Sequence, residues 1–165
     1  MTRIQKQVSP ESALPAAIMI HLALCMGVVL FAGVSAYLRS SGVMTGYDAT
    51  LALALGAAGG GLLVVAAGFA AMAPRMLAGK ARRAAAEAAS TEAGEQVIAG
   101  HWIQLVIARL AMFEAAALLT VVGVLVSGEW LLFIGTGLGV LAMIALRPTR
   151  ADRDRFTATV LNESA

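Results

Sequence analysis

The chain has 165 residues, of which 59% are hydrophobic and only 13% are charged, whereas soluble domains carry roughly 45–50% apolar and about 25% charged residues. This composition excludes an ordinary soluble domain and predicts a single all-α integral membrane domain over residues 1–165. The formal net charge is +2, but the positions of the charges matter more than their sum. We expect the lipid bilayer, and no nucleic acid, as a partner.

Four stretches of the chain are apolar enough to form transmembrane helices, each of which needs about 20 residues. They are residues 16–38, 49–73, 103–126 and 130–146. Pro74 and Pro148 each follow one of these stretches, and each is predicted to end a helix because proline lacks a backbone N–H. The predicted fold is a four-transmembrane-helix bundle of two antiparallel hairpins, the second closed by a short turn.

Two polar segments complete the predicted architecture. Residues 74–102 are rich in Ala, Glu, Lys and Arg, which favours a helical cytoplasmic loop between the second and third spans. This loop either extends the third span as a solvated helix or lies on anionic headgroups. The tail, residues 147–165, is compatible with a short surface helix or with a disordered segment.

Lys and Arg gather on one predicted side of the membrane. Arg3 and Lys6 precede the first span, other basic residues lie in the 74–102 loop and the tail, and the opposite loops hold only Arg39. Cytoplasmic loops retain such an excess of positive charge. The sequence therefore predicts a multi-pass protein of the bacterial inner (plasma) membrane with both termini in the cytoplasm. A cleaved signal peptide is disfavoured, because the first apolar run exceeds the roughly 7–15 residues of a signal's apolar region.

Three ionisable residues lie inside predicted spans: His21, Arg109 and Glu114. Such residues are costly in hydrocarbon and indicate a candidate functional site. At 1.5 Å per residue from Ile103, Arg109 lies about 9 Å deep and Glu114 about 16 Å deep. The five-residue step between them turns about 140°, so they do not stack. Glu114 must find its partner on another helix or copy, with Arg109 and His21 as candidates, or stay protonated.

Glu114 has two interpretations. It is either a neutral acid hydrogen-bonded between helices, or a carboxyl group that binds and releases a proton or an ion. For Arg109 the simpler interpretation is an interfacial anchor, and for His21 it is a buried ring satisfied by a backbone carbonyl. No catalytic or cofactor-binding motif is present, so we expect no catalytic residue, no metal and no cofactor, and the chain is not expected to be an enzyme.

Glycine pairs mark two spans. Gly56 and Gly60 in the second span, and Gly135 and Gly139 in the fourth, have the GxxxG spacing. Small residues four positions apart let helix backbones approach closely in membranes. These glycines are predicted to mediate helix packing, within one chain or between copies.

Two resemblances concern the third and fourth spans. The run "FEAAALLTVVGVLV" (113–126) resembles the ion-carrying helix of ATP synthase proteolipid (c-type) subunits, which implies that Glu114 binds a proton or sodium ion in a ring of identical chains. The third and fourth spans resemble those of small uncharacterised four-span bacterial membrane proteins. The resemblance rests on Arg109 and Glu114 in the third span and on the exit "LRPTR" (146–150). That group implies no activity.

Together these features predict a structural or accessory helix bundle that packs with itself, as a homo-oligomer, or with a membrane complex. The alternative is a proteolipid-like protein that handles protons or ions through Glu114. The first role needs no water path to the middle of the membrane, whereas the second requires one.

Overall fold

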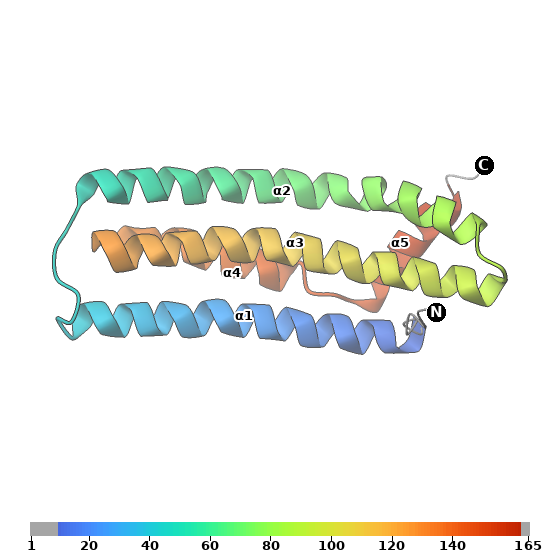
Figure 1. Cartoon of the computed structure of the whole chain (residues 1–165), viewed down its shortest axis with the longest axis horizontal. Coiled ribbons are helices and arrows are strands. Elements are labelled where there is room, and N and C mark those ends of the chain that lie inside the picture. Colours follow the sequence, from blue (N-terminus) through green and yellow to red (C-terminus); the bar gives the residue numbers. More distant parts are fainter. Residues whose placement is uncertain (1–9, 163–165) are drawn as a thin grey trace, which may run out of the picture. The chain divides into compact units, whose positions relative to one another are not determined.

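The computed structural model describes residues 10–162, and within them the chain is helical, with no strand (Figure 1). The elements are α1 (Pro10–Ser40), α2 (Ala49–Ala86), α3 (Thr91–Ser127), the 3-10 turn η1 (Trp130–Leu132), α4 (Phe133–Ala145) and α5 (Arg150–Asn162). Helices α1, α2 and α3 are long and apolar enough to cross a membrane, as expected for a membrane helix bundle. Arg3, Lys6 and the last three residues lie outside the described residues.

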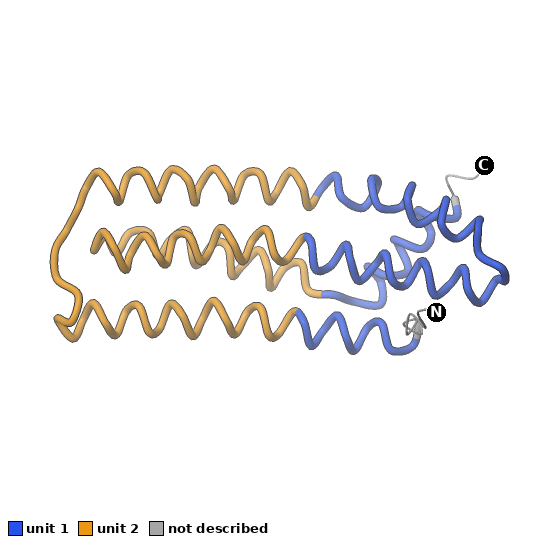
Figure 2. The backbone as a smooth tube through the Cα atoms, viewed as in Figure 1, with its two compact units in different colours: residues 1–20, 71–108, 148–165 blue, residues 21–70, 109–147 orange. Residues whose placement is uncertain are grey.

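The chain divides into two compact units, shown in Figure 2. Unit 2 contains residues 21–70 and 109–147, and unit 1 contains residues 1–20, 71–108 and 148–165. All three ionisable residues predicted to lie in the membrane belong to unit 2. Most of the basic residues of the predicted cytoplasmic segments belong to unit 1.

Helix α3 is the central helix among the three long ones. Half of the residues in its most apolar window are buried, against 17% for α1 and for α2. Within unit 2, α4 packs on α3 through glycines. A Cβ added at Gly139 would lie 2.8 Å from the Cβ of Ala117, and one added at Gly135 would lie 2.7 Å from Cγ2 of Thr120. The predicted close packing of these two glycines is therefore found within one chain.

The fourth predicted span is the shortest helical segment of unit 2. It consists of the three residues of η1 and the 13 residues of α4. Glu129 caps η1, because its side chain accepts a hydrogen bond from the Leu131 N–H at 3.0 Å. At 1.5 Å per residue, α4 alone covers only about 20 Å of a hydrocarbon core that is about 30 Å thick.

Pro74 does not end α2, contrary to the prediction from the sequence. The helix continues through Pro74 to Ala86. Proline removes the hydrogen bond to the carbonyl four residues earlier, which here is the carbonyl of Ala70. The Nε–H of Arg109 donates to that carbonyl at 3.1 Å, so the helix loses a backbone donor without leaving the acceptor unpaired.

The segment 74–102, predicted as a helical loop, is mostly helix. Residues 74–86 extend α2, and α3 begins at Thr91. Only residues 87–90 separate the two helices, and the hydroxyl of Ser90 accepts a hydrogen bond from the Ala93 N–H at 3.2 Å. Serine is a favoured residue at such helix starts, which explains the position of the break.

The tail of unit 1 forms helix α5, which answers the question that the sequence left open. Polar contacts from Trp102 and Arg82 hold it. The indole N–H of Trp102 donates to Asp152 Oδ2 at 3.2 Å, and Arg82 Nε donates to the carbonyl of Val160 at 2.9 Å. Phe156 and Val160 supply the buried apolar face. Arg82 thus donates to a carbonyl in the last turn of α5, where the carbonyl groups have no N–H partner within the helix.

Candidate functional site around Glu114

Glu114 lies on α3 and points toward α1. Its Oε1 is 3.9 Å from the position that a Cβ would take on Gly27, and the side chain is half-buried. Within residues 10–162 the carboxyl group forms no hydrogen bond and no ion pair. The described chain therefore leaves its central carboxyl group without a polar partner.

Arg109 points toward a different helix. Its Nε bonds to the Ala70 carbonyl of α2, whereas Glu114 contacts α1. The two residues diverge because five residues turn the helix about 140°, as the sequence indicated. The structure thus assigns Arg109 a backbone partner on α2 and does not pair it with Glu114.

His21 lies on the inner face of α1 and is only 9% exposed. Its Nε2 is 3.9 Å from the sulfur of Cys25, one helical turn further on. Its Nδ1 is buried and has no hydrogen-bond partner in the described chain, so the backbone partner expected for it is not formed. In contrast, Nδ1–H of His101 donates to the carbonyl of Val97, four residues earlier, at 2.9 Å.

Ser35 is a polar residue of this region that the sequence analysis did not identify. It is fully buried, and its hydroxyl group has no partner in the described chain. Serine in a helix commonly donates to the carbonyl four residues earlier, as Ser127 does to Gly123 at 2.6 Å. The available signal was spacing, because His21, Val28 and Ser35 follow one another at intervals of seven residues on the same helix face.

A second missed feature joins α3 to α4. The hydroxyl oxygens of Thr120 and Thr136 lie 2.9 Å apart, and Thr120 donates to the carbonyl of Ala117 at 2.8 Å. Both threonines are buried. A polar contact between α3 and α4 is therefore made by a threonine pair on another face of α3.

Hydrogen bonds of Arg39 and Tyr47 join elements of unit 2 near the loop between α1 and α2. Arg39 Nε donates to the carbonyl of Val124 at 3.1 Å, and its Nη1 donates to the carbonyl of Gly46 at 2.8 Å. The hydroxyl of Tyr47 donates to Glu129 Oε2 at 3.1 Å. This hydrogen bond, together with the negative charge of Glu129, raises the pKa of Tyr47. Arg39 thus links α1 and the following loop to the last turn of α3.

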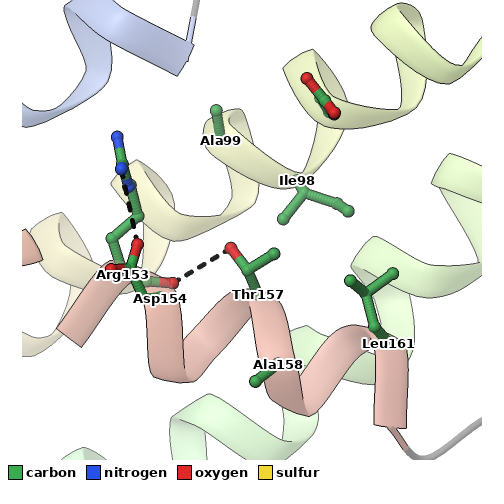
Figure 3. A pocket seen from close by; sticks show the side chains of 8 residues that line it. Ile98, Ala99, Arg153, Asp154, Thr157, Ala158 and Leu161 are labelled. Atoms are coloured by element: carbon green, nitrogen blue, oxygen red, sulfur yellow. Dashed lines mark hydrogen bonds and ion pairs between the residues drawn. The ribbon is translucent and has the colours of Figure 1, made fainter. Parts of the chain in front are cut away.

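Other parts of the molecule offer less defined chemistry. In the described chain, no group of three or more His, Cys, Asp or Glu side chains is placed to hold a metal ion. Unit 1 contains a pocket of about 410 Å³ between α3 and α5 (Figure 3). Ile98 and Ala99 line it from α3, and Thr157 and Leu161 from α5. None of the residues predicted from the sequence to be functional lines this pocket.

These observations describe a helix bundle with spans suited to a membrane and an unpaired carboxyl group on its central helix. No protein-family model, curated protein or solved structure matches the chain.

Proposed function

We propose that the protein is a structural or accessory membrane helix bundle that assembles with a second copy of itself through α2. The observation that carries this proposal is a run of small exposed residues along α2. The exposed face of α2 includes Ala57, Gly61 and Gly68, and a Cβ added at either glycine would meet no atom within 4 Å. These positions are spaced so that they share one side of the helix.

Both helices also expose large side chains. On α1 these include Met19 and Leu30, which are 70% and 61% exposed, and on α2 they include Leu53 and Val64, which are 76% and 73% exposed. Large flexible side chains suit contact with lipid, whereas small residues allow the close backbone approach that drives helix association in membranes. The exposed run of Ala57, Gly61 and Gly68 on α2 is therefore the surface that we propose for a second helix.

This proposal is tested by counting copies in lipid vesicles by single-molecule photobleaching. We expect wild-type dimers, and we expect Gly61→Leu to reduce the dimer fraction at least tenfold because the added side chain separates the helices. Gly33→Leu is the matched control, since Gly33 is an exposed glycine of α1 with no atom within 4 Å of its added Cβ. A monomeric wild type, or equal loss in both variants, would overturn the proposal.

A second function, proton or ion handling by Glu114, is favoured by a separate observation. The Glu114 carboxyl group lies deep in an apolar helix and has no polar partner within residues 10–162. An unpaired ionisable group at such a depth is unfavourable unless it changes protonation state or binds a cation. Proton exchange at Glu114 would use this property. The threonine pair supplies a polar link between helices that does not involve Glu114.

The second function is tested by infrared spectroscopy of the reconstituted protein, with Glu114→Gln to assign the carboxyl band. We expect the Glu114 band to change between its protonated and ionised forms as the pH is varied. A carboxyl group that stays protonated wherever the bundle is folded would exclude ion handling and leave the structural role.

The membrane topology belongs to the same proposal. We place the protein in the bacterial inner membrane with both termini in the cytoplasm, because basic residues are concentrated near the end of α2 and around α5. Among them are Lys80, Arg82, Arg150 and Arg155. Fusing GFP to the C-terminus tests the orientation, since GFP becomes fluorescent in the cytoplasm and fails to do so after export in unfolded form.

A further inference from the structure

The inner face of α1 contains two buried polar groups that do not use the partners normally available in a helix. Nδ1 of His21 and Oγ of Ser35 have no hydrogen-bond partner in the described chain. Equivalent groups elsewhere bond to the carbonyl four residues earlier, as in His101 with Val97 and Ser127 with Gly123. The contrast shows that the fold satisfies such groups in other places.

Glu114 lies between these two groups along the direction of α1. Helices α1 and α3 run parallel within unit 2, because Gly27 meets Glu114 and, further along both helices, Arg39 meets Val124. His21 precedes Gly27 by six residues and Ser35 follows it by eight, so they lie about 9 Å and about 12 Å away along the helix axis. Three unpaired polar groups are thus spaced along one side of the bundle.

Unpaired buried polar groups in native proteins are usually satisfied by ordered water. In a membrane the cost of leaving them unsatisfied is several kcal/mol per group, because no bulk water is present. Gly27 has no side chain, and a Cβ there would lie 3.9 Å from Glu114 Oε1, so the backbone of α1 comes close to the carboxyl group. These properties describe positions that bind water molecules.

We infer that water binds along the inner face of α1 at two positions, one at His21 Nδ1 and one at Ser35 Oγ, and that further water molecules join these positions to Glu114 and give it proton access from both directions. The exchange is balanced: a protonated Glu114 releases one proton to water and accepts one from water, with no other reactant. The inference extends the second proposed function, proton or ion handling by Glu114. It rests on that function only for what the protein does with the exchanged protons; the two water positions do not depend on it.

The test is the rate at which the Glu114 carboxylic acid exchanges its proton for deuterium after transfer of the reconstituted protein to D₂O. Infrared spectroscopy follows the exchange at an acidic pH, where the Glu114 group is protonated, and Glu114→Gln identifies the band. In wild type we expect exchange within seconds. We expect Ser35→Ala and His21→Phe each to slow it at least fivefold, and the double variant to slow it at least 20-fold.

Thr136→Val is the matched control, because it also removes a buried hydroxyl group of unit 2, but on the side of α3 that faces α4. It should leave the exchange rate unchanged. Wild-type exchange over hours, or rates that neither Ser35→Ala nor His21→Phe alters, would overturn the inference.

Cys25 provides a measurement that requires no substitution. It is the single cysteine of the chain, and its sulfur lies 3.9 Å from His21 Nε2. Labelling of Cys25 in intact vesicles by a small water-soluble methanethiosulfonate reagent would support the water position at His21. A Glu114 group that exchanges through His21 and Ser35 but never ionises would disprove ion handling while leaving the two water positions in place.

Discussion

The two sides of α3 differ in whether the buried polar side chains beside them have hydrogen-bond partners. Toward α4, glycines bring the backbones together, and Thr120 and Thr136 satisfy each other at 2.9 Å. Toward α1, the carboxyl group of Glu114 and the inner-face groups of His21 and Ser35 have no partner in the described chain. A fully satisfied interface adds rigidity and register, whereas unsatisfied groups attract water, ions or another chain. The two sides of α3 therefore differ in whether their buried polar groups have partners within the described chain.

The largest expected effect comes from filling the close contact between α3 and α4. Gly139→Leu should reduce the free energy of unfolding by about 3 kcal/mol, because overpacking against rigid neighbours forces backbone shifts. The added Cβ would meet the Cβ of Ala117 at 2.8 Å and the carbonyl oxygen of Phe113 at 3.3 Å. Gly137→Leu introduces the same side chain where no atom lies within 4 Å, and should be nearly neutral. Unfolding in mixed detergent micelles measures both, and similar losses would show that the α3–α4 contact is not specifically tight.

The next effect concerns the carbonyl that Pro74 leaves without a helical donor. Arg109→Leu should cost about 2 kcal/mol, since a hydrogen bond from a charged donor contributes about 1.5–3 kcal/mol. Pro74→Ala restores a backbone N–H to the Ala70 carbonyl, so the double variant should recover at least half of that loss.

Pro15→Ala is the control for this pair. Pro15 also lies inside a helix, but the carbonyl that it leaves free belongs to Glu11, an exposed residue that water reaches. Additive effects of Arg109→Leu and Pro74→Ala in a double-mutant cycle would mean that the arginine does not compensate for the proline.

A smaller effect compares the two sides of α3 directly. Thr136→Val should cost about 0.6 kcal/mol, the average for hydrogen bonds between helices in membranes. Ser35→Ala should cost close to nothing, because the Ser35 hydroxyl bonds to no group of the described chain. The same unfolding assay distinguishes the two, and a greater loss from Ser35→Ala would contradict the contrast between the two interfaces.

The smallest effect is at the exposed end of unit 2, where Tyr47 donates to Glu129. This bond raises the pKa of Tyr47 above its usual value near 10, so the neutral phenol is favoured in the folded state. The stabilisation is therefore fully present below about pH 10 and is lost as the pH rises through the raised pKa. Wild type should be slightly more stable than Tyr47→Phe at neutral pH, and the difference should vanish in strong alkali. A difference independent of pH would show that the hydrogen bond contributes nothing.

The sequence predicted the long helices, and it predicted that Arg109 and Glu114 diverge on α3. These features depend on apolar run length and on the 3.6-residue period, which are local properties. It did not predict that α2 passes through Pro74, because the compensating donor is Arg109, 35 positions further along the chain. It also missed Ser35 and the threonine pair. An isolated Ser or Thr in an apolar run does not reveal from the sequence whether its hydroxyl group has a hydrogen-bond partner.

Composition alone determined that this chain is built for a membrane, because a chain so apolar and so poor in charge cannot cover its surface with polar groups. The charge of Glu114 and its depth along α3 were equally visible in the sequence. Only the tertiary structure decided which polar groups have partners, because hydrogen bonds between helices depend on contacts between residues far apart in the chain. Arg109 donates a hydrogen bond to the Ala70 carbonyl. Glu114 lies beside Gly27, and its carboxyl group has no hydrogen-bond partner in the described chain.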